Sequence, residues 1–221
     1  TGELVTFTSG TGMGKSSIMR ELVHHIMNNT KDNIGLLSLE ESIRNTALNI
    51  MSVEANARLY IKEVRDTYTR DQLNVFDKNT IGTERFFAYD HFGSDKIRHM
   101  VAGNQCKWIF LDHLSILVSG QEDMGDERKG IDLLMTKLRS LVEETQVGLM
   151  LVSHLRRVGG DRGHEDGREV SLSHLRGSQS ISQLSDTVIS MERNQQESDE
   201  RLANTSTIRI LKNRYTGDVG I

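Results

Sequence analysis

Short runs of apolar, β-branched and aromatic residues recur along the chain, separated by longer polar or amphipathic segments. Several of these runs are apolar almost throughout rather than alternating, which is typical of strands buried on both faces. The predicted strands are Leu4–Thr8, Ile34–Leu39, Phe86–Tyr89, Trp108–Leu111, Gly148–Ser153, Thr187–Met191 and Ile208–Leu211. The pattern predicts an α/β protein whose mostly parallel central sheet is flanked by helices on both faces.

Helical periodicity is clearest over Lys129–Gln146, where Ile131, Leu134 and Leu138 share one apolar face. This helix should pack on the sheet. The sequence contains no proline. Glycine, asparagine and aspartate must therefore mark the ends of its helices and strands. The other predicted elements are helices over Ser16–Asn28 and Ile43–Val64, a helix opened by Gly93, Ser94 and Asp95, and a loop over Val158–Arg168.

Composition narrows the classes of protein that fit. A chain of 221 residues with 36% hydrophobic and 26% charged residues can form one sizeable core, and no run is long and apolar enough to span a bilayer. Cys106, the single cysteine, cannot form an internal disulfide and is best explained as a small buried residue, so we expect a cytoplasmic location. The net charge of −4 restricts any DNA contact to local basic clusters. We expect residues 1–221 to be one domain of a longer protein.

A glycine-rich segment follows the first predicted strand and leads into a predicted helix. Small residues there allow backbone N–H groups to surround phosphates, and the helix N-terminus adds a positive partial charge. A lysine can then reach the β- and γ-phosphates, and the following hydroxyl can bind Mg²⁺. The segment is Ser9-Gly10-Thr11-Gly12-Met13-Gly14-Lys15-Ser16-Ser17. It has the spacing of a phosphate loop, although Ser9 stands where the usual pattern has glycine.

Polar residues end three other predicted strands. Asp112 follows Trp108–Leu111, where a phosphate-loop protein holds the water shell of its Mg²⁺. Glu40 follows a second strand and is our candidate for the base that orients or deprotonates the attacking water; Glu40 and Glu41 could instead begin the next helix. His154 could hydrogen-bond a γ-phosphate, although a histidine at the end of a strand is more often structural.

These motifs, in this order, resemble the RecA-like core of DnaB-type hexameric replicative helicases, in particular those of phage primase-helicases. The resemblance runs over the whole chain. Its other specific segments are Asp126-Glu127-Arg128-Lys129, Leu175-Arg176-Gly177-Ser178, Gln183-Leu184-Ser185-Asp186, Glu192-Arg193-Asn194-Gln195-Gln196 and Arg214-Tyr215-Thr216-Gly217-Asp218. In this family the leading glycine of the phosphate loop is commonly absent, which accounts for Ser9.

The resemblance implies a role for each matching residue. Lys15 and Ser16 bind phosphate and Mg²⁺, Glu40 is the catalytic carboxylate, and Asp112 is the Walker B acid at the metal. His154 and Gln183 sense the γ-phosphate, and Arg214 is an arginine finger that completes the neighbouring subunit's site. Arg58, Arg193 and Tyr215 contact the base or sugar of the nucleotide. The DNA-contacting residues implied are Arg156, Arg176 and Gly177, while Arg157 and Arg162 replace the family's loop lysines only at inexact positions.

The implied protein is a hexameric ring that hydrolyses ATP or another NTP or dNTP with Mg²⁺ and moves along single-stranded DNA. Several copies of a small basic loop would converge in one channel, so no single chain needs to be basic. The resemblance also suggests a primase domain and a replicative polymerase as partners, and no membrane. Two alternatives stay open. One is a RecA-type recombinase, and the other is a loader or DNA-binding module that does not hydrolyse nucleotide but binds it as a switch.

Overall fold

The computed structural model describes residues 2–91, 94–114, 127–156, 163–176 and 179–221. All seven predicted strands form, and they make a mostly parallel seven-stranded sheet. The chain divides into two compact units, one of residues 1–15 and 113–221 and the other of residues 16–112. The predicted α/β architecture is therefore confirmed, and each unit contributes its own group of strands.

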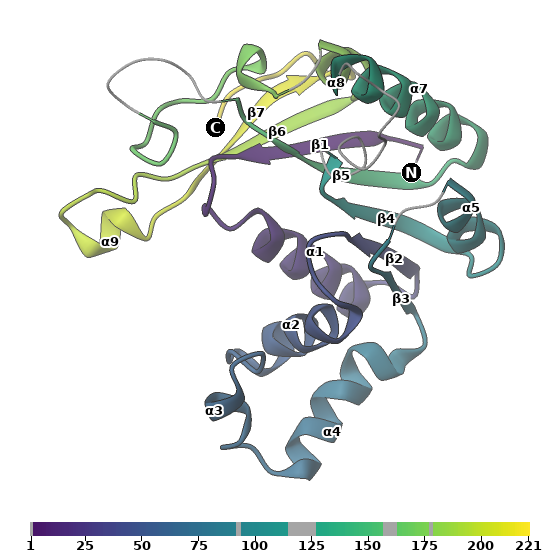
Figure 1. The fold of residues 1–221 in the computed structure, drawn as a ribbon, viewed down its shortest axis with the longest axis vertical. Coiled ribbons are helices and arrows are strands. Elements are labelled where there is room, and N and C mark those ends of the chain that lie inside the picture. The colour runs from purple at the N-terminus through teal and green to yellow at the C-terminus, as the bar shows by residue number, and fades with distance from the viewer. Residues whose placement is uncertain (1, 92–93, 115–126, 157–162, 177–178) are drawn as a thin grey trace. The chain divides into compact units, whose positions relative to one another are not determined.

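The first unit contains four strands in the order β5-β1-β6-β7. β1 pairs in parallel with β5 and β6, whereas β7 runs antiparallel to β6. Helices α7 and α8 pack against each other and on β1 (Figure 1). The elements of this unit are β1 (Leu4–Ser9), α7 (Glu127–Thr145), β5 (Gly148–His154), η2 (Leu172–His174), α8 (Gln179–Leu184), β6 (Thr187–Glu192), α9 (Glu200–Ala203) and β7 (Thr207–Asn213).

The core of the first unit follows the predicted hydrophobic pattern. Leu4 and Phe7 of β1 are buried, and so are Ile131 and Leu138 of α7. Asp132, on the opposite face of α7, is exposed. Because the apolar face of the helix covers an apolar strand, the amphipathic helix predicted over Lys129–Gln146 is confirmed, with slightly shifted ends.

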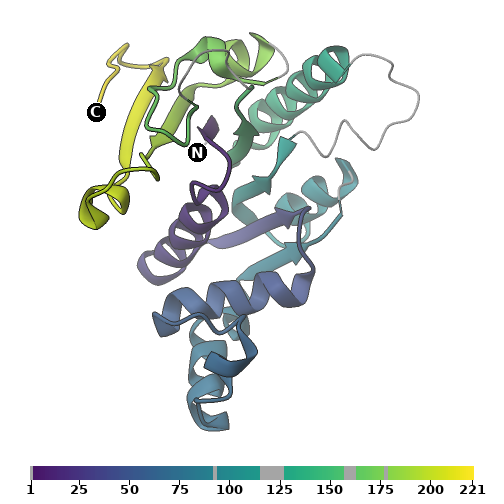
Figure 2. The ribbon, with the colours of Figure 1, turned by 60° about the vertical axis from the view of Figure 1, so that its left-hand side comes forward.

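The second unit contains the parallel strands β3-β2-β4. Helices α1 and α2 lie on one side of these strands and α5 on the other, as right-handed crossover connections require (Figure 2). A Cβ on Gly35 of β2 would lie 2.5 Å from the Met100 Sδ, so glycine permits the close approach of α5. The elements are α1 (Lys15–Asn29), β2 (Asn33–Ser38), α2 (Ile43–Ala55), α3 (Lys62–Arg65), α4 (Arg70–Asn79), η1 (Ile81–Thr83), β3 (Phe86–Tyr89), α5 (Ser94–Ala102) and β4 (Cys106–Asp112).

The helix predicted over Ile43–Val64 is wrong in its extent. It ends at Ala55 because Asn56 adopts a left-handed conformation with φ of 47°, and the Ala57 N–H then donates to the Ser52 carbonyl oxygen. The sequence pattern also missed α4, whose apolar face is limited to the half-buried Leu73 and Phe76 and which has no buried residue. The predicted helix near Gly93 forms as α5 from Ser94 onward, while Gly93 itself lies outside the described residues.

Cys106 is buried at the start of β4, as expected for a structural cysteine. Burial raises the pKa of its thiol to about 12, which keeps the thiol protonated and unreactive. Among the helices in the described ranges, none is long and apolar enough to cross a membrane.

Candidate nucleotide-binding site

The phosphate loop occupies residues 10–14, between the end of β1 and the start of α1. Gly12 and Gly14 have φ of 69° and 96°, values that L residues with a side chain rarely adopt. The Met13 side chain is buried and anchors the middle of the loop. The strand, loop and helix predicted from the glycine spacing are all present.

Lys15 is the first residue of α1, and its side chain turns back over the loop. Its Nζ donates to the carbonyl oxygens of Ser9, at 3.1 Å, and Gly10, at 2.9 Å. Thr11 and Gly12 are exposed, and Ser16 is partly exposed at the N-terminus of a 15-residue helix. An ammonium group, a helix N-terminus and a hydroxyl at one loop fit a phosphate with its Mg²⁺, because Mg²⁺ prefers oxygen ligands.

The parallel register places His154 beside this loop. His154 of β5 pairs with Ser9, the last residue of β1, and Met191 of β6 pairs with Ser9 from the other side. The carboxyl ends of three strands therefore meet at the edge where the phosphate loop begins. His113 contacts His154 edge-on, with ring centroids 4.0 Å apart. Sequence reasoning gave His113 no role, although it follows Asp112 directly.

In the second unit, the register brings Glu40 and Asp112 to neighbouring strand ends. Ser38 of β2 pairs with Asp112 of β4, and the Leu39 N–H donates to the Asp112 carbonyl oxygen at 2.8 Å. Asp112 is buried, whereas Glu40 is exposed. Asp112 thus ends β4, and Glu40 follows the adjacent parallel strand β2.

The Glu41 side chain has partners in two helices. The Glu41 carboxylate accepts hydrogen bonds from Arg20, Thr46 and Asn49, each at 3.0 Å. Helix α2 begins later, at Ile43, with Ser42 as its N-cap. Glu41 is therefore occupied in joining α1 to α2.

Two residues that sequence reasoning missed cover the phosphate loop. The Gln195 Nε2 donates to the Gly12 carbonyl oxygen at 3.0 Å. A Cβ on Gly10 would lie 3.0 Å from the His164 Cβ, so His164 packs directly on the loop. Only the segment Asn194-Gln195-Gln196 in the family resemblance pointed to this region.

The other residues assigned to the nucleotide come from several different elements. Arg193 follows β6, and its Nε is buried with no hydrogen-bond partner in the described part of the chain. Gln183 is exposed on α8, and Tyr215 is exposed beyond β7. Arg58 follows α2 in the second unit and is exposed. The Arg214 guanidinium contacts Asp186, at 3.2 Å.

The segments assigned to DNA pair with each other just beyond β5. The Arg156 N–H donates to the His174 carbonyl oxygen, and the Arg176 N–H donates to the His154 carbonyl oxygen, both at 2.9 Å. An antiparallel bridge between Leu155 and Leu175 lies between them. Arg156 and Arg176 are thus held together with His154, while Gly177, Arg157 and Arg162 lie outside the described residues.

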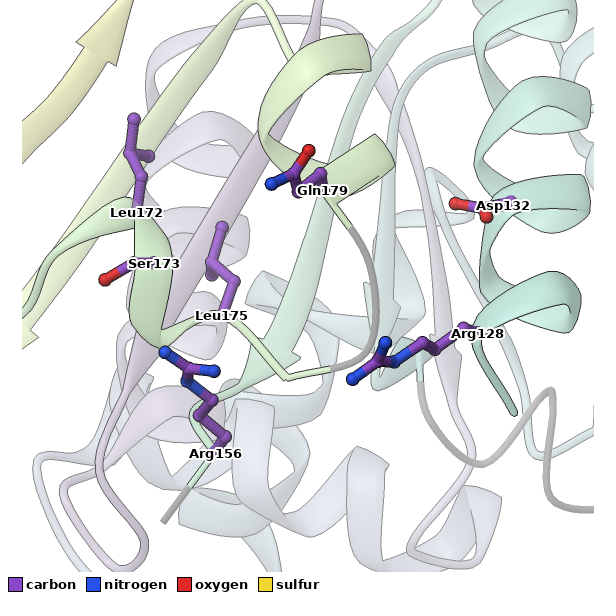
Figure 3. Close-up of a pocket in the computed structure, with 7 residues that line it drawn as sticks. All are labelled: Arg128, Asp132, Arg156, Leu172, Ser173, Leu175 and Gln179. Carbon is purple, nitrogen blue, oxygen red and sulfur yellow. The ribbon is translucent and has the colours of Figure 1, made fainter. Parts of the chain in front are cut away.

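A pocket of about 440 Å³ opens beside this bridge. Arg128 at the start of α7 and Arg156 reach toward it from two different elements, and Leu172 and Leu175 give it an apolar side (Figure 3). Sequence reasoning did not assign Arg128, although it belongs to the segment Asp126-Glu127-Arg128-Lys129 that carries the resemblance. The full lining is Arg128, Asp132, Arg156, Leu172, Ser173, Leu175 and Gln179.

A family model for the DnaB-like helicase C-terminal domain matches residues 1–221. The chain belongs to this family. It is 39% identical to a DNA helicase/primase of Enterobacteria phage T3, with all of this chain and 40% of that protein aligned. The chain thus spans well under half the length of this relative.

Solved structures have the same fold as this DnaB-like domain. A DnaB-like replicative helicase, solved in a study of its interactions with primase, gives a TM-score of 0.81 at 19% identity, over 99% of this chain and 54% of that chain. A separately solved ATPase domain superposes with a TM-score of 0.80, at 20% identity, over 99% of this chain and 79% of that chain. A KaiC-like protein of the archaeon Pyrococcus horikoshii gives 0.64 at 17% identity, over 99% of this chain and 82% of that chain. The RecA-like fold expected from the resemblance is confirmed.

Because buried His164 packs on the phosphate loop, we expect the stability of this DnaB-like domain to depend on pH. Burial lowers the pKa of His164 below its ordinary value of 6.5. At a pH between the lowered pKa of folded His164 and the ordinary pKa, the histidine binds a proton in the unfolded chain but not in the folded chain. The free energy of unfolding should therefore fall as the pH drops below about 6.5. Urea denaturation of the wild type at pH 7.5 to 5 should show this decrease, and His164→Phe should reduce it.

His25→Gln is the matched control, because His25 is exposed on α1. It should leave the pH dependence of the unfolding free energy unchanged. An equally steep decrease in His164→Phe would mean that other groups cause it.

Proposed function

We propose that this chain is the NTP-hydrolysing motor of a ring-shaped replicative DNA helicase, which moves along single-stranded DNA and unwinds duplex DNA. The observation that carries the proposal is the parallel register that sets His154 beside a phosphate loop with Lys15 folded over it. A loop alone would indicate nucleotide binding; a polar side chain at the neighbouring strand end adds a group that can respond to the γ-phosphate. Membership of the DnaB-like family supports the helicase activity.

Each side chain has a distinct part in hydrolysis. Lys15 neutralises charge on the β- and γ-phosphates. Ser16 and Asp112 hold Mg²⁺, which neutralises charge on the phosphate oxygens when bound. The exposed Glu40 carboxylate orients the attacking water and accepts its proton. His154 and Gln183 hydrogen-bond the γ-phosphate, and they lose these hydrogen bonds when the γ-phosphate is released.

The substrate is ATP or another NTP or dNTP. Arg193 and Tyr215 suit a nucleotide base or sugar, because a guanidinium plane and a phenol ring can both stack on a base. Tyr215 has 62% of its surface exposed, which leaves it accessible to a ligand or to a second subunit. Arg58, exposed in the second unit, would add a further contact to the same nucleotide.

Arg214 acts on the nucleotide of the neighbouring subunit. Its side chain is 58% exposed, and its guanidinium contacts Asp186 within its own chain, so it can face outward from the subunit. A guanidinium that reaches the γ-phosphoryl group stabilises the charge that develops during transfer. Each hydrolytic site is therefore completed by an adjacent copy, which requires a ring or a filament.

Single-stranded DNA binds along the bridge formed by residues 154–156 and 174–176 and the adjoining pocket. Arg128 and Arg156 would hold backbone phosphates, and the apolar side formed by Leu172 and Leu175 suits a sugar or base. Because the Arg176 N–H donates to the His154 carbonyl oxygen, a shift of His154 on loss of the γ-phosphate would move the DNA-contacting segment directly. Gly177 would contribute a backbone amide.

The phage T3 relative supports one of the partners proposed for the whole protein, a primase domain. That protein is named a DNA helicase/primase and is longer than this chain. We propose a homo-hexameric ring, a primase domain and a replicative polymerase as partners. Light scattering with Mg²⁺, a non-hydrolysable nucleotide and single-stranded DNA measures the ring size.

Hydrolysis and unwinding test the proposal. The wild type should hydrolyse NTP faster with single-stranded DNA and should unwind a forked duplex that has a free 5′ tail. Lys15→Ala should abolish both activities, because it removes the cation from the β- and γ-phosphates. Undiminished turnover by Lys15→Ala would contradict its role.

The same measurements separate the alternatives. Stable filaments that pair strands and show no preference for a fork would indicate a RecA-type recombinase. Nucleotide binding without hydrolysis, even with Mg²⁺ and single-stranded DNA, would indicate a nucleotide-switched loader or DNA-binding module.

Mixing experiments test whether Arg214 acts in trans. Arg214→Ala should bind nucleotide but lose about a hundredfold or more in kcat. Arg214→Ala subunits keep Glu40, and Glu40→Gln subunits keep Arg214. A mixture of the two should therefore regain hydrolysis, at about a quarter of the interfaces if equal amounts mix at random. A mixture as inactive as its components would exclude a finger that acts across the interface.

DNA titrations test the pocket. Arg128→Ala and Arg156→Ala should each weaken binding to single-stranded DNA of any sequence. Each should also reduce the slope of log K against log salt by about 0.7, the value for one phosphate contact. Arg201→Ala, an exposed arginine on α9, is the control and should change neither quantity. An unchanged slope in Arg128→Ala would remove the pocket from the DNA path.

A further inference from the structure

Asp186 is a buried carboxylate at the point where several elements of the first unit meet. It lies between α8 and β6, and its side chain is 1% exposed. Its Oδ2 accepts the Leu4 N–H at 2.8 Å and the Arg139 Nη1 at 2.6 Å. Its Oδ1 accepts the Arg214 Nη1 at 3.2 Å. One carboxylate thus joins the start of β1, helix α7 and the residue that follows β7.

The backbone of Asp186 binds two of the same partners. Its N–H donates to the Leu4 carbonyl oxygen, and its carbonyl oxygen accepts the Arg214 N–H, both at 2.8 Å. The main chain of Arg214 is therefore fixed relative to the carboxylate that its guanidinium contacts. This arrangement leaves the Asp186 carboxylate in a defined position.

The charge of Asp186 is stabilised in the folded chain. Burial raises the pKa of this carboxyl, but the Leu4 N–H and the Arg139 and Arg214 guanidiniums together outweigh burial and hold the pKa below its ordinary value. Asp186 consequently stays ionised at neutral pH and remains an acceptor for both guanidiniums.

The two arginines that share this carboxylate differ in exposure. The Arg139 side chain is 17% exposed and also bonds Glu143, so it stabilises the packing of α7. The Arg214 side chain is 58% exposed. Because Arg139 already pairs with the buried charge, Asp186 does not depend on Arg214 for a cation. The benefit of the second contact falls on Arg214, an exposed side chain with high rotamer entropy.

We propose that Asp186 is the positioning residue for Arg214, holding one edge of the guanidinium so that its remaining donors face the neighbouring subunit's nucleotide. This inference rests on the proposed function, in which Arg214 completes that site. A guanidinium has five N–H donors, so the contact to Asp186 through Nη1 leaves others for a phosphate. Preorganised donors stabilise transition-state charge more than mobile ones, because the cost of orientation is met before the reaction.

The same contact ties Arg214 to its own subunit's phosphate loop. Leu4 begins β1, and β1 ends at Ser9, where that loop starts. A short buried strand therefore separates Asp186 from the loop. Arg214, which acts on the neighbouring subunit's nucleotide, is thus held at one end of β1. The phosphate loop, which binds this subunit's own nucleotide, leaves from the other end.

Asp186→Asn tests the proposal. The amide keeps the size of the side chain and one oxygen for the Leu4 N–H and Arg139, but it turns an N–H donor toward Arg214. Arg139→Gln is the matched control, since it removes the other guanidinium from Asp186 and leaves the contact with Arg214. Both variants should lower the Tm, because both weaken the Arg139 ion pair.

Only Asp186→Asn should affect the finger. Its kcat for DNA-stimulated hydrolysis should fall by about tenfold to a hundredfold, with nucleotide affinity unchanged, because only the orientation of Arg214 is lost. Arg139→Gln should keep the kcat of the wild type. Mixing Asp186→Asn with Glu40→Gln subunits should restore hydrolysis, whereas mixing it with Arg214→Ala should not, since both of those defects lie on the finger side. A defect confined to folding would not show this pattern.

The outcomes separate the inference from the function on which it rests. If Arg214→Ala is inactive but Asp186→Asn retains full kcat, the positioning role is wrong and the finger stands. If Asp186→Asn is inactive and Glu40→Gln subunits fail to restore it while they restore Arg214→Ala, Asp186 acts within its own site and the proposal is wrong. If Arg214→Ala itself is active, Arg214 does not act as a finger in trans, and the positioning role proposed for Asp186 is wrong as well.

Circular dichroism and nucleotide binding check the fold of each variant before kinetics. If Asp186→Asn does not fold, Asp186→Glu replaces it. Glutamate keeps the charge for Arg139 but moves the carboxylate by one methylene. The same loss of kcat and the same mixing pattern are expected, and full kcat would overturn the proposal.

Discussion

The first unit depends on the parallel pairing of β1 with β5 on one side and β6 on the other. Both edges of β1 are hydrogen-bonded and its apolar side chains are buried, so the strand cannot shift without breaking two ladders. The phosphate loop leaves directly from its end, at Ser9. Two glycines with positive φ allow the chain to turn sharply at this fixed strand end, and Lys15 lies over the loop that results.

The opposite end of β1 is held by a different kind of interaction. There a buried carboxylate, Asp186, bonds the Leu4 N–H and two guanidiniums. Removing a carboxylate from water is costly unless charged donors replace the water, and Arg139 and Arg214 supply them. Under the proposed function, one strand then has its own nucleotide at one end and the support of the neighbour's arginine finger at the other. This arrangement suits a motor whose sites must act in sequence, because both groups are attached to the same rigid strand.

The strands could be predicted because each contains a run of apolar, β-branched or aromatic residues, even β7, none of whose residues is buried. Helices were predicted where an apolar stripe is long, as over Ile131 to Leu138, and missed where it is short, as in α4 with Leu73 and Phe76. The break at Asn56 was not foreseen, because periodicity continues through a residue that leaves the helical conformation. The choice between Glu40 and Glu41 stayed open in the sequence, since the partners of Glu41 come from α1 and α2.

By itself, the sequence determined the phosphate loop, the order of the polar strand ends and the family to which they point. These features are local: glycine spacing, an apolar run and the residue that follows it are all set within a few positions. Only the tertiary structure decided that His164 covers Gly10, that Arg128 faces the pocket with Arg156, and that Asp186 holds Arg214. Such contacts join residues far apart in the chain, and they depend on strand register and helix packing, which no local pattern encodes.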